Sequence, residues 1–575
     1  MIKTFFPIFI LLFVSAIAQS PAEKISPRLK AKLLAENNEE NFLVWIYFND
    51  KGDDLQKYYH NSESLVSKKS LQRRNKVLSK KNAIDFLDIP VNQNYLNEII
   101  SSGFRVKHKS KWFNAVSGYA TKDHIQKISA LPFVKKIDIV SKYLIEQPKD
   151  EANSDNLLTK FSYQPEGVHT YNYGSSYTQY SISSIPQVHD LGYNGQGVTI
   201  CLMDAGFANL SHEVFQNMNI IAMYDFVAGS TTMGGHPHGT ATLSLIGGFK
   251  EGQLVAPAFG ANFILARTEN DPTETPVEED NWIAAMEWAD SIGVDVTSTS
   301  LGYLTFDPPY NSYTWQDMDG NTAIITKGAD IAASKGIVVL NSAGNSGYNP
   351  NHNTLGAPAD GDSVITIGSV DASGNRAYYS SVGPTVDGRI KPDLMAMGMG
   401  TYIALTSSPT AYTISSIGGT SYACPIAAGV AALLLSVNPS LTPMEIRDIL
   451  RQTASNSSNP DNLIGWGIVD ALAAVNFVLT DVKEETVPDN YFMLSNYPNP
   501  FNPYTTVRFT LPEETKLKLA LYDILGNEVM VLLDELVQPG THELTLNGKD
   551  LASSIYFLRM NSENFTKAIK VSLIK

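Results

Sequence analysis

Three residues of the kinds needed to cleave an amide bond occupy separate, glycine-containing stretches of this chain. Ser421 comes just before a long apolar segment of helical pattern, so its hydroxyl would stand at a helix N-terminus, where N–H groups and the helix dipole favour developing negative charge. His238 also opens a helical segment, and Asp204 follows an apolar run typical of a buried strand. A serine nucleophile needs a base that takes its proton and a carboxylate that orients this base. Singly, each residue is better explained as a helix cap, a turn former or a surface histidine.

Their order along the chain and the motifs around them make coincidence implausible. The order Asp, His, Ser is that of subtilisin and differs from the orders in chymotrypsin and the α/β-hydrolases. Residues 203–206 (Met-Asp-Ala-Gly), 238–240 (His-Gly-Thr) and 419–425 (Gly-Thr-Ser-Tyr-Ala-Cys-Pro) resemble the three signature motifs of the subtilisin-like serine proteases. Residues 342–347 (Ser-Ala-Gly-Asn-Ser-Gly) resemble the oxyanion-hole motif of that family.

The resemblance implies a serine endopeptidase that hydrolyses peptide bonds of protein substrates through an acyl-enzyme intermediate. Asp204, His238 and Ser421 would form its catalytic triad. Asn345 would donate to the oxyanion together with the backbone N–H of Ser421.

The resemblance extends to substrate binding. Ser300, Leu301 and Gly302 match the strand that lines the primary specificity pocket of the family and pairs with extended substrate. Backbone pairing of this kind would supply affinity, and side-chain pockets would select the sequence that is cut.

Two positions depart from the family pattern. Ala205 replaces the Thr or Ser that usually follows the triad aspartate, which removes a hydroxyl that could support the carboxylate. Met397 replaces the usual proline before the glycine of a turn that follows the sheet. Neither change removes a triad residue or an oxyanion donor, so we expect them to affect efficiency and not the type of reaction.

The elements that would position these residues alternate in type between residues 185 and 480, the expected peptidase domain. Apolar runs typical of strands lie at 198–203, 262–267, 336–341 and 363–368, and helical segments lie at 240–245, 281–292, 322–334, 423–437 and 442–453. Apolar strands that alternate with helices predict an α/β fold with a mostly parallel sheet covered on both faces, the doubly wound arrangement of subtilisin-like proteins.

The chain before this domain divides into three parts. Residues 1–18 predict a signal peptide; the alternative, a membrane anchor, needs about 20 apolar residues. Residues 19–150 predict a small α+β unit that resembles the pro-region of these proteases, an intramolecular chaperone and inhibitor removed by self-cleavage. Residues 151–184 are polar and typical of a linker or processing region, and we place the cut between Tyr143 and Ser184.

Charge separates the front unit from the rest of the 575-residue chain. The formal net charge is −15, yet residues 21–150 hold about 23 Lys and Arg against about 15 Asp and Glu. A basic unit followed by an acidic remainder suggests two parts that hold each other electrostatically. The dibasic pair Arg73 and Arg74 is either a processing site or part of a solvated helix face, and we favour the solvated face.

The last part of the chain, residues 491–575, follows a charged linker at 481–490. Short alternating runs at 505–511, 516–522, 542–546, 554–560 and 567–573 predict a small β-sandwich. Residues 496–503 (Asn-Tyr-Pro-Asn-Pro-Phe-Asn-Pro), 522–526 (Tyr-Asp-Ile-Leu-Gly) and the terminal Lys575 resemble the type IX secretion sorting domain of Bacteroidetes. The resemblance implies the type IX machinery as a partner and a protein that is secreted or attached at the cell surface. A substrate-binding sandwich is the alternative.

Composition limits the partners and cofactors. The negative net charge disfavours nucleic acid, because phosphate binding needs a basic face. Only Cys201 and Cys424 are present, so a disulfide scaffold is excluded, and we expect two buried thiols and not a bridge. We expect a monomer with no required cofactor and no metal ligand. The resemblance leaves structural calcium open at residues 317–321 (Asp-Met-Asp-Gly-Asn), although Gly328 stands where an EF-hand needs glutamate, which favours a polar loop.

Two other functions fit part of the sequence. A peptidase with a Ser-Glu-Asp set would work at acid pH, but His238 and Asn345 argue against it. An inactive adhesin on a protease scaffold would not need intact triad and oxyanion residues. We therefore predict a secreted serine endopeptidase, matured by loss of its N-terminal region, whose activity falls below about pH 6–7 because its histidine must be neutral.

Overall fold

The structure is a computed structural model that describes residues 20–35, 41–53, 55–59, 61–78, 82–140, 169–270, 277–304, 312–416, 418–480, 493–497, 499, 501–511, 513–524, 526–562 and 566–573. The chain divides into two compact units, Met1–Leu479 and Thr480–Lys575. The predicted signal peptide, most of the predicted processing region, the linker at 481–490 and Lys575 lie outside the described residues.

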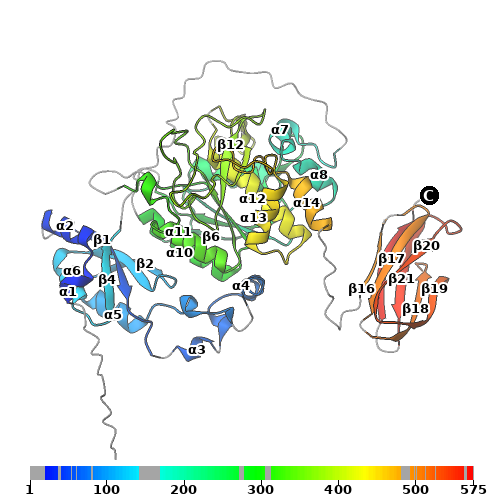
Figure 1. Ribbon diagram of the computed structural model, residues 1–575, viewed down its shortest axis with the longest axis horizontal. Coiled ribbons are helices and arrows are strands. Elements are labelled where there is room, and N and C mark those ends of the chain that lie inside the picture. Colours follow the sequence, from blue (N-terminus) through cyan, green and yellow to red (C-terminus); the bar gives the residue numbers. More distant parts are fainter. Residues whose placement is uncertain are drawn as a thin grey trace, which may run out of the picture. The chain divides into compact units, whose positions relative to one another are not determined.

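A parallel sheet forms the centre of the first unit (Figure 1). Among the described residues it has seven strands in the order β13-β12-β11-β10-β5-β9-β6, and neighbouring strands run parallel. The strands are β5 (Thr199–Asp204), β6 (Asn219–Asp225), β9 (Asn262–Arg267), β10 (Val296–Thr299), β11 (Val338–Ser342), β12 (Ile365–Val370) and β13 (Leu394–Met397). Two short antiparallel pairs join β7 (Phe249–Lys250) to β8 (Leu254–Val255) and β14 (Tyr402–Ala404) to β15 (Tyr412–Ile414). The predicted parallel α/β sheet is confirmed.

Helices cover both faces of this sheet, as a doubly wound fold requires. One face carries α9 (Pro237–Gly247) and α12 (Thr420–Val437), and the other carries α10 (Val277–Ile292) and α11 (Ile324–Ser334). The remaining helices of this part are η4 (Gly174–Ser176), α7 (Tyr177–Ser181), α8 (Ile185–Asp190), η5 (Glu213–Phe215), η6 (Trp315–Asp317), α13 (Pro443–Thr453) and α14 (Ala471–Thr480). Within the described ranges, α12 is long and apolar enough to cross a membrane, but most of it is buried in the core.

The strand that ends at Asp204 shows how the sequence encodes the two-sided burial. Ile200 and Leu202 of β5 join the core on the side of α9 and α12, whereas Cys201 and Met203 join the core on the opposite side. A strand covered on both faces is apolar along its whole length, which is the pattern from which it was predicted. Cys201 and Cys424 are both free and buried, so the expectation of two buried thiols is confirmed.

The strand predicted at the specificity pocket is shifted along the chain. β10 ends at Thr299, so Ser300, Leu301 and Gly302 lie just beyond the strand and not in it. The carbonyl oxygen of Leu301 accepts from Asn341 Nδ2 at 2.9 Å, a side-chain partner that replaces a strand neighbour. The sequence does not reveal β10 itself, because its Thr-Ser-Thr run lacks the apolar pattern of a buried strand.

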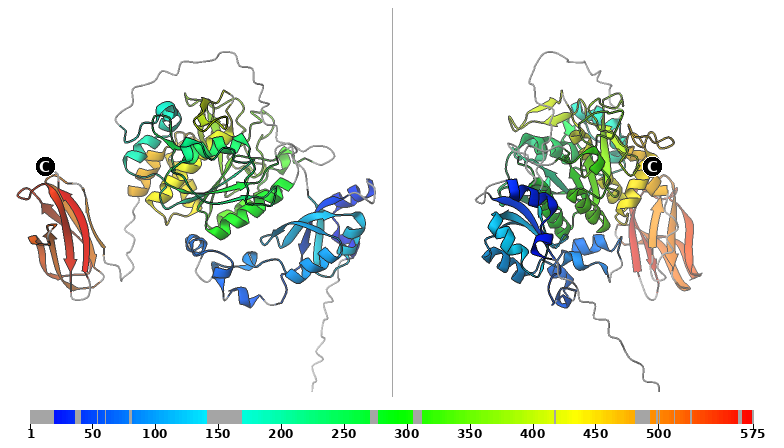
Figure 2. Two further views of the ribbon diagram at one scale, coloured as in Figure 1. Left: turned by 180° about the vertical axis from the view of Figure 1, so that it is seen from behind. Right: turned by 60° about the vertical axis from the view of Figure 1, so that its left-hand side comes forward.

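The N-terminal region forms a separate layer of the first unit, as predicted for an α+β unit (Figure 2). Its antiparallel sheet has the order β2-β3-β1-β4, with β1 (Phe42–Phe48), β2 (Arg105–Ser110), β3 (Ala115–Ala120) and β4 (Val134–Ile139). Its helices are α1 (Pro21–Lys24), α2 (Pro27–Ala35), α3 (Gln56–Tyr59), η1 (Ser62–Ser64), α4 (Lys68–Arg74), η3 (Phe86–Asp88), α5 (Gln93–Ser101) and α6 (Lys122–Ser129). Val44 and Ile46 of β1 pack under these helices, while Leu43 and Trp45 belong to a second cluster that includes Ile324 of α11. One face of this sheet thus contacts the central domain.

One prediction about the front of the chain is wrong, and another is resolved only in part. Helix α4 ends at Arg74, and its Arg73 and Arg74 side chains are 1% and 0% exposed, so they do not form a solvated face. Residues 169–184, the end of the stretch predicted as a linker or a segment draped over the domain, fold against the core, where Tyr173 and Tyr180 are fully buried. In both places polar composition conceals burial, because tyrosine and arginine can be buried when their polar atoms have partners.

The second unit is a β-sandwich with a core of its own. One sheet has the order β16-β17-β20, and the other has the order β19-β18-β21-β22. The strands are β16 (Met493–Tyr497), β17 (Tyr504–Leu511), β18 (Thr515–Tyr522), β19 (Glu528–Val537), β20 (Gly540–Asn547), β21 (Ser554–Asn561) and β22 (Thr566–Leu573). The predicted sandwich is confirmed, but β16 and β19 were missed. Both are edge strands. Because β19 is mostly exposed, it lacks the alternation of apolar and polar residues by which a half-buried strand is recognised.

Candidate active site

The Asp204 carboxylate is buried and held by donors from three directions. Asp204 ends β5 and is 1% exposed. Its Oδ1 accepts from the backbone N–H of Ala205 at 2.7 Å and lies 2.8 Å from His238 Nδ1. Its Oδ2 accepts from the hydroxyl of Thr242 at 3.0 Å. The carboxylate is therefore fixed so that it orients the imidazole of His238.

His238 stands in the first turn of α9, where the local sequence places it. His236 is the N-cap residue, its Nδ1 accepts from the backbone N–H of His238 at 3.2 Å, and Pro237 occupies the first helical position. Gly239 allows the helix to approach the loop after β5, since a Cβ atom there would lie 2.1 Å from the carbonyl oxygen of Gly206. The imidazole is 14% exposed and therefore reachable from solvent.

Ser421 lies in the first turn of α12, as the sequence predicts. Its Oγ donates to the carbonyl oxygen of Ser300 at 3.1 Å, and the Ser300 hydroxyl donates back to the carbonyl oxygen of Ser421 at 2.9 Å. The ring of Tyr422 stacks on His238 with ring centroids 5.9 Å apart. These contacts bring the N-terminus of α12, the loop after β10 and the start of α9 together.

Asn345 follows β11 and has its amide oriented by Thr420. Asn345 Oδ1 accepts from both the backbone N–H and the hydroxyl of Thr420, each at 3.0 Å. With the oxygen so engaged, the amide nitrogen is the group left to serve as a donor beside the first turn of α12. That is the geometry expected for an oxyanion donor.

A cavity of about 500 Å³ unites the predicted residues. Among the residues that line it are His238, Ser300, Leu301, Gly302, Asn345 and Ser421. Asp204 lies behind His238, away from this surface. Every site residue predicted from the sequence therefore belongs to one place in the fold.

Thr242 contacts the candidate site and could not be recognised from the sequence. Its hydroxyl donates to Asp204 and so provides the support that Ala205, without a hydroxyl, cannot give. It lies four residues after His238, one helical turn along α9, and so faces the same side of the helix. The other departure, Met397, is buried in a small apolar cluster with Val370 and Met395, so methionine takes the place of proline as packing.

A second buried carboxyl, Glu269, lies next to this site. The pKa of Glu269 is raised to about 7 by burial and by the charge of Asp204, although hydroxyls of Tyr303 and Thr268 donate to the carboxyl and oppose the rise. A neutral Glu269 spares Asp204 the repulsion of a second negative charge in the interior.

In the described part of the chain, no group of three or more His, Cys, Asp or Glu side chains is arranged to hold a metal ion. Asp319, from the loop considered for calcium, accepts from the backbone N–H groups of Asn321 and Thr322 at 2.7 Å each. Its carboxylate thus shapes the turn before α11.

Comparison with known proteins identifies the family of the central domain. Subtilisin DY from Bacillus licheniformis is 33% identical over 293 residues, which are 50% of this chain and 94% of that protein. Subtilisin NAT from Bacillus subtilis subsp. natto is 31% identical over 371 residues, 61% of this chain and 88% of that protein. Residues 195–467 match the model of the Subtilase family. This chain belongs to the subtilase family. It is therefore a serine endopeptidase, as the sequence predicted.

The ends of the subtilase match families of their own. Residues 43–156 match the Peptidase S8 propeptide domain of Bacteroidota, and residues 495–575 match the Secretion system C-terminal sorting domain. The subtilase is thus made with a propeptide, and its sorting domain marks it for export across the outer membrane, to the cell surface or the medium. The predicted pro-region and sorting domain are confirmed.

Proposed function

We propose that the subtilase cleaves proteins through a triad of Asp204, His238 and Ser421 and an acyl-enzyme intermediate. The observation that carries this proposal is the 2.8 Å contact between Asp204 and His238 at the wall of the cavity that Ser421 also lines. A carboxylate can only accept, so in this contact Nδ1 of the imidazole carries the proton, and Nε2 is the unprotonated nitrogen that acts as the base.

The first chemical step forms a bond between Ser421 Oγ and the carbonyl carbon of the substrate. The Ser421 hydroxyl leaves the Ser300 carbonyl oxygen, and its proton passes to His238 Nε2 as the bond forms. The oxyanion accepts from the amide of Asn345 and the backbone N–H of Ser421. His238 then protonates the leaving amine, and a water molecule, activated by the same imidazole, hydrolyses the acyl-enzyme.

Ser300, Leu301 and Gly302 are proposed to bind the substrate backbone. They line the cavity directly after β10, and the Ser300 carbonyl oxygen becomes free when Ser421 turns to attack. An extended substrate segment would pair with this stretch and place its scissile bond at Ser421. The chemistry needs no cofactor, and a structural calcium ion stays a prediction from the family resemblance with no site assigned.

Maturation by loss of the N-terminal region is the last part of the proposal. We place the cut between Tyr143 and His169, because the chain from His169 onward packs against the central core. The C-terminal limit of the proposed cleavage interval thus moves from Ser184, as predicted from the sequence, to His169. We expect the mature enzyme to be a monomer that acts on protein or peptide substrates.

The test compares residues 19–575 with the same chain carrying Ser421→Ala. The unaltered chain should shorten to a mature form and label with a fluorophosphonate, whereas Ser421→Ala should do neither. Ser436→Ala is the matched control, since its hydroxyl also lies on α12 but donates to Leu433 within the helix. If both chains mature alike and neither is labelled, the protein is an inactive scaffold and the proposal fails.

A further inference from the structure

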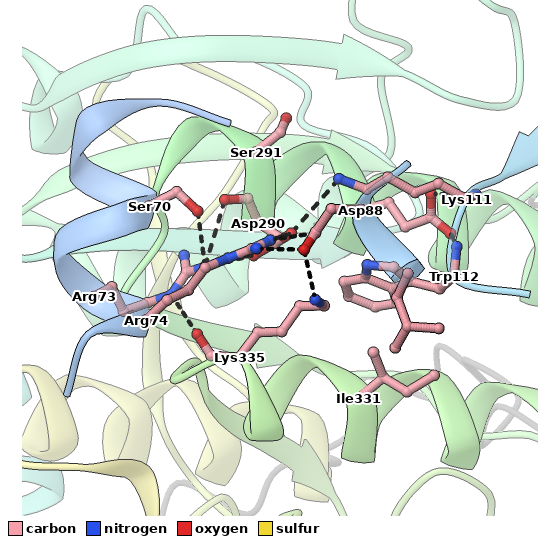
Figure 3. A network of polar contacts seen from close by, with 12 residues as sticks. Ser70, Arg73, Arg74, Asp88, Lys111, Trp112, Asp290, Ser291, Ile331 and Lys335 are labelled. Carbon is pink, nitrogen blue, oxygen red and sulfur yellow. Dashed lines mark hydrogen bonds and ion pairs between the residues drawn. The ribbon is translucent and has the colours of Figure 1, made fainter. Parts of the chain in front are cut away.

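Helix α4 of the N-terminal region buries two consecutive arginines against the peptidase domain (Figure 3). The guanidinium groups of Arg73 and Arg74 lie next to each other, and both donate to the Asp290 carboxylate of α10. Burial of two cations costs several kcal/mol each unless partners surround them. The hydrogen-bond partners of Arg73 and Arg74 therefore indicate which ligand this site binds.

Arg73 joins the C-terminal ends of two helices. Its Nε donates to the carbonyl oxygen of Lys335, after α11, at 3.1 Å, and its Nη1 donates to that of Val294, after α10, at 2.6 Å. Its Nη2 donates to the Asp290 carboxylate at 2.5 Å. Helix C-termini carry unpaired carbonyls and the negative end of the dipole, so this position suits a cation. A guanidinium donates from three separate nitrogens and so spans acceptors on both helices, whereas the donors of a lysine ammonium all lie on one nitrogen.

Arg74 and its neighbours complete the network. Arg74 Nη2 donates to Asp290 at 2.5 Å, and both Nη atoms contact Asp88 at 2.8 Å. Lys335 donates to Asp88 at 3.1 Å, so a cation of the peptidase domain binds a carboxylate of the N-terminal region. Although burial opposes it, the charges of Arg73 and Arg74 hold the pKa of Asp290 below its usual range.

The residues of the peptidase domain at the ends of α10 and α11 complement helix α4. Among the described residues, the side-chain partners of the Asp290 carboxylate all come from the N-terminal region: Arg73, Arg74 and Lys111. Glycines follow both helices: Gly293, at φ +102°, and Gly336, at φ +90°. A Cβ atom on Gly293 would lie 2.8 Å from the backbone nitrogen of Ser70, and one on Gly336 would lie 3.0 Å from the carbonyl oxygen of Arg73. Thus the glycines also admit the α4 backbone.

The place is separate from the substrate cavity. Asp204 ends β5, and Ser300 and Asn345 follow the carboxyl ends of β10 and β11. Val294 and Lys335 precede the amino ends of β10 and β11. Because the strands are parallel, the two sets lie at opposite edges of the sheet.

We propose that the C-terminal ends of α10 and α11 form a guanidinium-binding site, and that Arg73 and Arg74 are the ligands through which α4 anchors the pro-region to the peptidase domain. The anchor acts apart from the contact of the four-stranded sheet with α10 and α11. The inference rests on the proposed role of the N-terminal region as a removable pro-region. It also gives the dibasic pair a function in binding, since a fully buried pair is closed to proteases.

The test uses the full chain with Ser421→Ala, so that its outcome does not depend on self-cleavage. Hydrogen exchange of backbone amides, followed by mass spectrometry, is compared between this chain and the same chain with Arg73→Lys. We expect the exchange rate of the α4 amides to rise by about tenfold or more, because lysine keeps the positive charge but lacks the several donor nitrogens of the guanidinium. Exchange in β1 should stay unchanged.

Arg28→Lys is the matched control, because Arg28 is half-exposed and contacts Asp138 at 3.4 Å within the N-terminal region. It should leave α4 unchanged. Unchanged exchange of α4 in Arg73→Lys would overturn the inference, and so would an equal rise in α4 and β1, which would mean that the region unfolds as one body. Failure of the proposed proteolysis would appear only in chains that retain Ser421, so the two failures are distinguishable.

Discussion

At the scale of single residues, the hydrogen bonds that support Asp204 determine how firmly the proposed triad is oriented. A triad carboxylate keeps the imidazole in one tautomer and stabilises it when it is charged, so its own orientation must be fixed. Two donors besides His238 hold it here, the backbone of Ala205 and the hydroxyl of Thr242. Only proline at position 205 would remove the backbone donor, and it would also fix φ there, so a substitution of Thr242 tests the support more cleanly.

Thr242→Val should lower kcat by about tenfold and leave KM nearly unchanged, because a hydrogen bond to a charged group contributes about 1.5–3 kcal/mol and one backbone donor remains. Thr242→Ser should restore most of the activity. Steady-state kinetics on a peptide substrate provide the measurement. Thr326→Val is the control, since Thr326 donates to the buried carboxylate of Asp360 at 2.7 Å, away from the cavity. Equal losses in both valine variants would mean that Thr242 serves stability alone.

The sequence predicted the triad and Asn345 but not Thr242, for a physical reason. Asp204, His238 and Ser421 each stand beside glycines at the ends of elements, where motif and chain order are visible. Thr242 lies inside an apolar helix, where a threonine is usually packing whose hydroxyl bonds back to the helix. It does donate to Gly239 at 3.1 Å, so only the fold reveals its second partner.

At the scale of elements, the turn after β13 contacts the loop that leads to Ser421, the proposed nucleophile. Gly398 packs against the loop that leads into α12, and the N–H of Gly419 donates to the carbonyl oxygen of Gly398 at 3.1 Å. A Cβ atom on Gly398 would lie 2.4 Å from the carbonyl oxygen of Gly419. Such a contact is too close to exist, so a larger residue must move the loop that precedes Ser421.

Gly398→Ala should therefore reduce kcat/KM by about tenfold or more and destabilise the protein by about 1–3 kcal/mol, the usual cost of overpacking. Kinetics and urea unfolding would measure the two effects. Gly235→Ala serves as control, since its Cβ would make an ordinary contact of 3.4 Å with Ala208. Retention of full activity in Gly398→Ala would show that the loop before Ser421 is not positioned by this turn.

The sheet of the N-terminal region contains a histidine that should make its stability depend on pH. His108 of β2 lies 2.7 Å from Asn281 of α10, and burial lowers its pKa to about 4. In the unfolded chain a histidine titrates near 6.5. Between these two pKa values His108 binds a proton in the unfolded chain but stays neutral in the folded chain. The free energy of unfolding therefore falls as the pH drops from about 6.5 toward 4.

His108→Gln can keep the hydrogen bond to Asn281 but cannot titrate. Between pH 7 and pH 5 the free energy of unfolding should therefore fall by about 1–2 kcal/mol less in this variant than in the chain that keeps His108. Urea unfolding of the full chain with Ser421→Ala, with and without His108→Gln, is the measurement. Asp280 and Glu287 of α10 act in the opposite direction, because burial raises the pKa of each. The difference between the two chains isolates His108, and an identical pH dependence would contradict the expectation.

At the scale of the whole molecule, charge holds the front of the chain to the peptidase domain. The excess of basic residues before residue 150 predicted such attraction, and contacts such as Lys69 with Asp295 at 2.8 Å agree with it. The pattern could not tell which arginines are buried, because a charged residue looks the same in sequence whether solvent or a carboxylate surrounds it. Asp290 lies more than 200 positions from Arg73, and only the fold brings them together.

Export and proteolysis should be separable, because the last unit has a core of its own made by strands β16 to β22. A chain that ends at Thr480 retains every residue of the substrate cavity. It should mature and cleave a peptide substrate with kcat/KM within about twofold of the full chain, since domains with separate cores fold separately.

In a host with the type IX machinery, the chain that ends at Thr480 should stay inside the outer membrane, whereas the full chain appears outside. Immunoblots of cell fractions and medium, with the full Ser421→Ala chain as an exported but inactive control, provide the measurement. Export of the shortened chain would mean that the sorting information lies elsewhere, and loss of its activity would mean that the peptidase domain depends on the sandwich.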